Sequence, residues 1–229
     1  MSHRVPFSLA TALATLAFAC PAAASFHFMQ IEQVIGGYCG NPTVQAVQLR
    51  MRAGSQNLVS GIRLVAHDAA GDNPVILISF PGHADNSGAG LRILAATADF
   101  VTAGGPQPDF TLTNPIPPEY LAAGKITFET SGGFVYWSLA WGGASYTGTN
   151  TSGDTTNDDD GNFNPPFPGI LPYSGNIALR FTGAAGAEST NNAADYALSA
   201  SPATFTNNDG AVDTLADCVQ KDGFEVITD

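Results

Sequence analysis

Apolar and polar residues alternate with a period of two along much of the chain, and the period of a surface helix is nearly absent. In "VQAVQLRMR" (residues 44–52), the apolar side chains of Val47, Leu49 and Met51 alternate with polar ones. "SGIRLVAHD" (residues 60–68) repeats the pattern. Alternation of this kind is typical of a strand with one buried face and one wet face.

Other stretches predict strands without clear alternation. "PVILISF" (residues 74–80) is a continuous apolar run, which predicts a strand buried on both faces. "GFVYWSLAW" (residues 133–141) is apolar on both faces and predicts a central strand. Two further segments are rich in β-branched and aromatic residues, "KITFET" (125–130) and "NIALRFT" (176–182). Turn clusters of Gly, Asn and Pro separate all of these runs.

Short strands separated by turns predict an all-β sandwich with long loops and at most two short helices. The two helical candidates are residues 97–104 and 117–124. We expect one β-sandwich domain over residues 25–208, followed by a C-terminal tail over residues 209–229. The segment 148–172, polar first and proline-rich after, is long for a loop and is therefore a candidate functional segment.

The first 24 residues predict a secretory signal peptide. Arg4 precedes an apolar run, and small residues lead to a cleavage point after Ala24. Cys20 raises lipidation as an alternative, but Phe18 stands where a lipidation signal needs a small residue, so simple cleavage is favoured. The expected location is therefore extracellular or at the cell surface, with the periplasm as an alternative.

Charge narrows the choice of partner. The chain carries 8 basic and 20 acidic residues, and loss of Arg4 with the signal peptide would leave a balance of −13. A nucleic acid is excluded as the partner, because phosphate contacts need clustered Lys and Arg. No later stretch is long and apolar enough to span a membrane. An acidic surface fits an exported protein or one that meets divalent cations.

Cys39 and Cys218 are the cysteines left after cleavage, and in an exported chain they predict one disulfide. Two free thiols or a thiol pair that binds metal are the alternatives, and neither suits an oxidising compartment. Closing so long a loop stabilises the fold by roughly 5 kcal/mol in the chain-entropy model. The C-terminal tail would thereby be tied to the first strand region.

"TSGDTTNDDDGNF" (residues 151–163) has the density of oxygen ligands that Ca²⁺ prefers. The candidate ligands are Asp154, Asp158, Asp160 and Asn162. The register of an EF-hand loop fails, because Thr156 takes its first position and Phe167 its twelfth. A solvated acidic loop is therefore the favoured interpretation, and a calcium site is the specific alternative.

No residues are assigned to catalysis. The chain has no G-x-S-x-G nucleophile motif. His27, His67 and His83 share no metal-ligand spacing, so we expect surface histidines in turns. Glu32, Glu129 and Asp99 lie in or beside apolar strand regions, and we expect them at exposed strand ends.

Trp141 and Tyr146 are candidates for a binding surface. Trp141 ends an aromatic strand just before two glycines, where its ring could stack on a sugar or a protein partner. Packing of these rings in the core is the favoured alternative, since aromatic residues of strands mostly serve the core.

Several segments together resemble secreted bacterial lamin-tail-like domains. They are a Phe-His start, "SFHFMQIEQVIGG" (25–37), a Trp-Gly segment, "LAWGGASYTGTN" (139–150), and "NNAADYALSASPATFTNND" (191–209). The resemblance implies an immunoglobulin-type β-sandwich that serves in attachment or interaction without catalysis. The ending "CVQKDGFEVITD" (218–229) resembles the "DGFE" ends of exported gammaproteobacterial proteins, which implies a Gram-negative source.

We therefore expect a secreted, non-catalytic module that binds an extracellular or cell-surface ligand, which the sequence does not identify. The segment 148–172 is its candidate interaction or metal site. One alternative is a small extracellular hydrolase with metal-assisted chemistry at the acids of that segment, and another is a passive structural protein of the envelope.

Overall fold

The computed structural model describes residues 26–218, so the predicted signal peptide, Cys20 and the "DGFE" segment lie outside it. The fold is mainly β and has two sheets. The first contains, in spatial order, β10 (Tyr196–Leu198), β9 (Leu179–Phe181), β1 (Met29–Ile35), β2 (Ala46–Met51), β5 (Arg92–Ala96) and β6 (Phe110–Thr111). The second contains β4 (Val75–Ser79), β3 (Ile62–His67), β7 (Gly124–Thr130) and β8 (Val135–Trp141).

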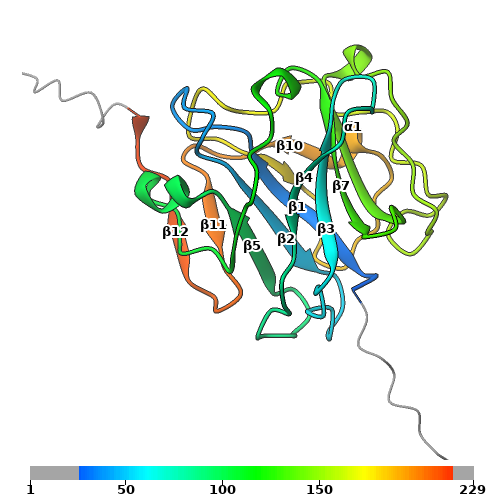
Figure 1. Ribbon diagram of the computed structural model, residues 1–229, viewed down its shortest axis with the longest axis horizontal. Coiled ribbons are helices and arrows are strands. Elements are labelled where there is room, and N and C mark those ends of the chain that lie inside the picture. The colour runs from blue at the N-terminus through cyan, green and yellow to red at the C-terminus, as the bar shows by residue number, and fades with distance from the viewer. Residues whose placement is uncertain (1–25, 219–229) are drawn as a thin grey trace, which may run out of the picture.

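The two sheets pack against each other around one main hydrophobic core, and Figure 1 shows β3 and β7 over β1 and β2. The alternation in the sequence decides which side chains enter this core. Val47 and Leu49 of β2 point into it, as do Leu64 of β3 and Leu139 of β8. All the strand pairs of both sheets are antiparallel except the pair β5–β6.

A third, two-stranded sheet covers one end of the six-stranded sheet. It consists of β11 (Thr204–Thr206) and β12 (Val212–Thr214), which Figure 1 shows beside β5. Together with the 3-10 helix η1 (Ala98–Ala103), this hairpin encloses a second core against the outer face of the sheet. Leu215 is buried in that core, so the predicted tail from residue 209 contributes a strand and a core residue to the fold.

A β-bulge in β1 shapes the rest of that outer face. The register with β2 shifts between Ile31 and Gln33, so Glu32 lies on the outer face beside Gln33. Glu32 is fully buried and lies 3.0 Å from Arg50 and 3.0 Å from Arg92. Gln48 donates a further hydrogen bond to the Glu32 carboxylate at 2.9 Å. The expectation that Glu32 is exposed is therefore wrong.

Two strands lie elsewhere than predicted. β8 is an edge strand of its sheet, not a central one. Residues 148–172 lie along its free edge in place of another strand, where the Ser152 hydroxyl donates to the Val135 carbonyl and the Phe167 amide to the Ala140 carbonyl. β4 is also an edge strand, and Ile76 on it is 40% exposed, so the prediction that residues 74–80 are buried on both faces is wrong.

The helical segments are all short. The two predicted ones appear as the 3-10 helices η1 and η2 (Pro118–Tyr120). Two others were not predicted, η3 (Gly143–Ser145) and the four-residue helix α1 (Asn192–Asp195), so the expected maximum of two is exceeded. Asn191 caps α1, because its side chain accepts a hydrogen bond from the Ala194 amide.

The predicted disulfide between Cys39 and Cys218 is present, with a Cα–Cα distance of 5.5 Å and a sequence separation of 179 residues. It joins the turn after β1 to the segment after β12 and packs on the second core. Within residues 26–218, no helix has the length and apolar character needed to cross a membrane.

Candidate functional site

A hollow of about 370 Å³ lies on the outer face of the four-stranded sheet. The register of β3 and β7 builds its floor, because it pairs Arg63 with Glu129 and His67 with Lys125. Alternate residues of a strand share one face, so these four polar side chains point to the same side of the sheet. The hollow is also lined by Val65, Pro74, Ile76, Thr127, Gly133 and Val135.

The carboxylate in the hollow is fully engaged. Arg63 forms an ion pair with Glu129 at 2.7 Å, and the hydroxyl of Thr127 donates to the other carboxylate oxygen at 2.8 Å. Lys125 donates from Nζ to the carbonyl of Thr149 at 2.9 Å. The hollow contains two cationic side chains, Arg63 and Lys125, and one carboxylate, Glu129. It therefore has one positive charge in excess, although the net charge of the protein is strongly negative.

Several donors in the hollow are buried without a hydrogen bond. They are Nε of Arg63 and the ring of His67, neither nitrogen of which makes a well-formed bond, although the Gly71 backbone lies close to the ring. Burial lowers the pKa of His67, and the neighbouring Lys125 lowers it further. Burial also lowers the pKa of Lys125, while Glu129 opposes that shift. Unpaired polar atoms in a hollow, next to groups such as His67 and Lys125 with displaced pKa values, are a common mark of a ligand site.

The lining of the hollow does not have the layout of a hydrolase. None of its residues is a serine or a cysteine, and Glu129 supplies its one carboxylate. The hydroxyl of Thr127 donates to the Glu129 carboxylate, which is a weak base because Arg63 holds it in an ion pair. The arrangement is suited to holding an anion through hydrogen bonds and ion pairing.

The sequence did not single out this hollow as a site. His67 was expected in a surface turn, but it is the last residue of β3 and both of its ring nitrogens are buried. Glu129 was expected to be exposed and is 6% exposed. The usable signal was the alternation itself, which puts Arg63 and His67 on the wet face of one strand and Lys125 and Glu129 on one face of another.

The acidic segment is partly built into the fold. Asn157 and Asp158 are fully buried, because Asn157 donates to the carbonyls of His27 and Tyr136. The prediction of a solvated loop is therefore wrong for these two residues and holds for Asp159 and Asp160, which are exposed.

Of the three predicted calcium ligands that are carboxylates, the structure brings together two. Oxygens of Asp158 and Asp160 lie within 4.8 Å of each other and of an oxygen of Asp159, which was not among the predicted ligands. Asp154 is outside this group, and its side-chain oxygen accepts from the Thr156 amide. The fourth predicted ligand, Asn162, donates its backbone amide to Asp158 and Asp160, while its side-chain oxygen accepts from Asn164. Burial raises the pKa of Asp158 to about 6, and the nearby Asp160 carboxylate adds to the increase.

Neither aromatic candidate presents its ring at the surface. Trp141 is 0% exposed and donates from Nε1 to the carbonyl of Tyr120. Tyr146 is 6% exposed, and its hydroxyl donates to the carbonyl of Thr149. Both rings pack in the core, which was the favoured alternative, so the candidate binding surface at these residues is not available to a ligand.

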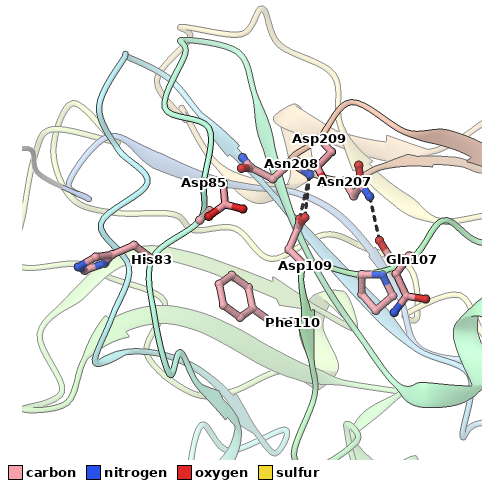
Figure 2. A pocket seen from close by; sticks show the side chains of 10 residues that line it. His83, Asp85, Gln107, Asp109, Phe110, Asn207, Asn208 and Asp209 are labelled. Carbon is pink, nitrogen blue, oxygen red and sulfur yellow. Dashed lines mark hydrogen bonds between the residues drawn. The ribbon is translucent and has the colours of Figure 1, made fainter.

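A second hollow, shown in Figure 2, has a similar volume but a different character. Asp109 and Asn208 lie side by side in its lining, where the backbone amide of Asn208 donates to the Asp109 carboxylate. Asp109 also accepts from the Leu94 amide, while Asn207 donates to the Gln107 carbonyl. These polar groups bond to one another, so we interpret them as a brace between loops.

Comparison of the chain with family models, with curated proteins and with solved structures found no match. The resemblance to lamin-tail-like domains therefore stays a prediction.

Proposed function

We propose that this protein is an exported, non-catalytic β-sandwich that binds a small organic anion in the hollow of the four-stranded sheet. The observation that carries the proposal is the set of buried nitrogens without hydrogen-bond partners, Nε of Arg63 and the ring of His67, beside the buried Lys125. Arg63 Nε and the neutral imidazole each have one N–H to donate. A buried donor without a partner costs free energy, which an acceptor oxygen of a ligand would recover.

The walls of the hollow indicate the rest of the ligand. Val65, Ile76 and Val135 are apolar and line the same space as the charged groups. A carboxylate with a short apolar chain matches both halves, because its oxygens would meet the donors and its chain would cover the apolar wall. The volume of about 370 Å³ suits a molecule of this size.

Calorimetry with hexanoate, and with hexanol as its neutral counterpart, tests this function. We expect hexanoate to bind with one-to-one stoichiometry and hexanol to bind far more weakly. Lys125→Met removes the charge and keeps the aliphatic stem, and we expect it to weaken hexanoate binding about tenfold, or about 1.4 kcal/mol.

Arg180→Met is the matched control, because Arg180 is a half-exposed cation on the other sheet and does not line the hollow. Its affinity for hexanoate should equal that of the wild type. Absence of heat with hexanoate, or equal loss in the two variants, would overturn the proposal.

The wider assignment is also a proposal. An immunoglobulin-type, lamin-tail-like architecture is supported by two mainly antiparallel sheets around a shared core. Export is supported by the disulfide, which forms and persists in oxidising compartments. A binding role is favoured over a passive envelope protein because the hollow has buried polar atoms without hydrogen-bond partners. The metal-assisted hydrolase stays the second candidate, because its acids lie in the segment 148–172 and its nucleophile would be a metal-bound water.

A further inference from the structure

The backbone around Asp158 is fixed on both sides. Arg52 donates to the carbonyl of Thr156 at 2.6 Å and to the side chain of Asn157 at 2.7 Å. Asp158 itself forms a parallel bridge with Ser189, and the Ser189 amide donates to the Asn157 carbonyl. The fold thus holds the Asp158 carboxylate in one place.

The two oxygens of the Asp158 carboxylate are in different situations. Oδ1 accepts hydrogen bonds from the backbone amides of Asp160, at 3.2 Å, and Asn162, at 3.1 Å. Oδ2 is buried and has no hydrogen-bond partner. Asp158 is 0% exposed, so bulk solvent does not reach this oxygen. A buried carboxylate oxygen in this state needs a donor or a cation.

The groups around that oxygen are also anionic. Asp159 and Asp160 are exposed, and each offers a carboxylate oxygen within 4.8 Å of the others. None of the ion pairs formed within residues 26–218 involves Asp158, Asp159 or Asp160. The three negative charges therefore lie together without a basic side chain to neutralise them.

We propose that Asp158, Asp159 and Asp160 bind a calcium ion, with the unpaired Oδ2 of Asp158 as its buried ligand. The donor set is made of oxygen, as hard cations require, and the group has no histidine or cysteine that would favour zinc. Two of the carboxylates are exposed, so water can complete the shell of six to eight oxygens that Ca²⁺ accepts. Mg²⁺ requires stricter octahedral geometry and releases its water reluctantly, so it should bind here more weakly.

Calorimetry on protein freed of metal by a chelator, near neutral pH, tests the site. We expect one calcium ion per chain, a rise in the thermal midpoint with calcium, and weaker binding of magnesium. An open site of this type should have a dissociation constant on the order of 10⁻⁴–10⁻³ M, as in extracellular calcium modules.

Asp158→Asn keeps the shape of the side chain and the acceptor for the two amides but replaces the unpaired oxygen with an NH₂ group. We expect it to weaken calcium binding at least about tenfold. Asp154→Asn is the matched control, because Asp154 lies in the same segment but outside the group, and its affinity should not change.

Asp160→Asn distinguishes a loss of calcium binding from a loss of folding. Asp160 is exposed, so its substitution should weaken calcium binding without unfolding the protein. The absence of both heat and a thermal shift with about 10 mM calcium would overturn the proposal. An equal loss in Asp154→Asn and Asp158→Asn would overturn it too, because it would indicate attraction by general negative charge. The hexanoate experiment concerns another face and other residues, so the two proposals can fail separately.

Discussion

At the scale of single residues, Glu32 has the most demanding environment. Its carboxylate is fully buried in the middle of a strand, with Arg50 and Arg92 in contact and Arg180 at 3.9 Å. Arg50 is 7% exposed at its side chain, so it has lost its water as well. A buried pair is stable only while both charges are present, because the loss of one leaves the other without compensation.

Glu32→Gln should therefore destabilise the protein by about 3 kcal/mol, because Arg50 would stay buried without its counter-charge. Urea unfolding measures the change. Glu188→Gln is the control. Glu188 is 53% exposed and lies 3.7 Å from Arg52, and the buried Arg52 side chain would keep its hydrogen bonds to Thr156, Asn157 and Gly186. Loss of that pair should cost less than about 1 kcal/mol. Similar losses in both variants would contradict the role given to Glu32.

His67 should make stability depend on pH. Its pKa is lowered in the folded protein, mainly by burial and then by Lys125, while Glu129 and Asp68 oppose the shift. Below the unfolded value of about 6.5, the unfolded chain therefore binds the proton more readily than the folded one. The contribution of His67 to the free energy of unfolding is complete above about pH 6.5. It decreases as the pH falls, by at most about 1.4 kcal/mol per pH unit.

Thermal midpoints measured between about pH 5 and 7.5 test this expectation. His67→Gln should flatten the decrease toward low pH, whereas His83→Gln, at an exposed position, should retain it. Asp158 acts in the opposite direction, since its raised pKa of about 6 favours the folded state as the pH falls. The comparison of the two histidine variants removes that contribution, and equal slopes in both would contradict the assignment to His67.

At the scale of elements, the strands with one polar face were predictable and the others less so. β2 and β3 follow the alternation closely, because one face of each carries polar residues. The wet face predicted for β2 is wrong, because its polar face is buried: Gln48 accepts from the Thr206 amide, and Arg50 donates to the carbonyls of residues 183 and 184. β5 has no such signal, since Ile93 and Ala95 enter the main core while Leu94 and Ala96 enter the second core. A strand buried between two cores has a continuous apolar sequence. Hydrophobic periodicity cannot distinguish such a strand from a segment of a buried helix.

The hairpin β11–β12 should act as part of the core and not as a tail. Leu215 is 1% exposed and packs in the second core, so Leu215→Ala should cost about 3 kcal/mol by leaving a cavity. Denaturant unfolding measures the loss. Val212→Ala, at a position 58% exposed on the same hairpin, should change stability by less than about 0.5 kcal/mol. A Leu215 variant as stable as the Val212 variant would show that the hairpin is dispensable.

At the scale of the whole molecule, the sequence indicated the disulfide and the oxygen ligands of the acidic segment, but it did not indicate the hollow. The pairing of Cys39 with Cys218 was predictable, because the third cysteine, Cys20, falls within the predicted signal peptide. The hollow depends on β3 and β7, which are separated by about 60 residues and meet only in the folded sheet. The spacing of residues along the chain does not show which distant strands pair. The proximity of Lys125 and His67 therefore could not be predicted before the register of β3 and β7 was known.

The same limit applies to the acidic segment. Its composition predicted oxygen ligands, but composition could not separate buried Asp158 from exposed Asp159, which follows it directly. That difference comes from the bridge to Ser189 and from the bonds of Asn157, which are contacts between distant parts of the chain. A local pattern therefore identified the segment, and tertiary contacts selected the carboxylate.

The bond between Cys39 and Cys218 encloses almost the whole described domain in a single covalent ring. A protease that cuts one exposed loop within this ring leaves a nicked molecule whose two fragments are still connected. Both cores and both sheets would keep their parts at high effective concentration after such a cut. An exported protein that meets proteases could in this way survive a first cleavage as a functional unit, and it would separate into fragments only after reduction and unfolding.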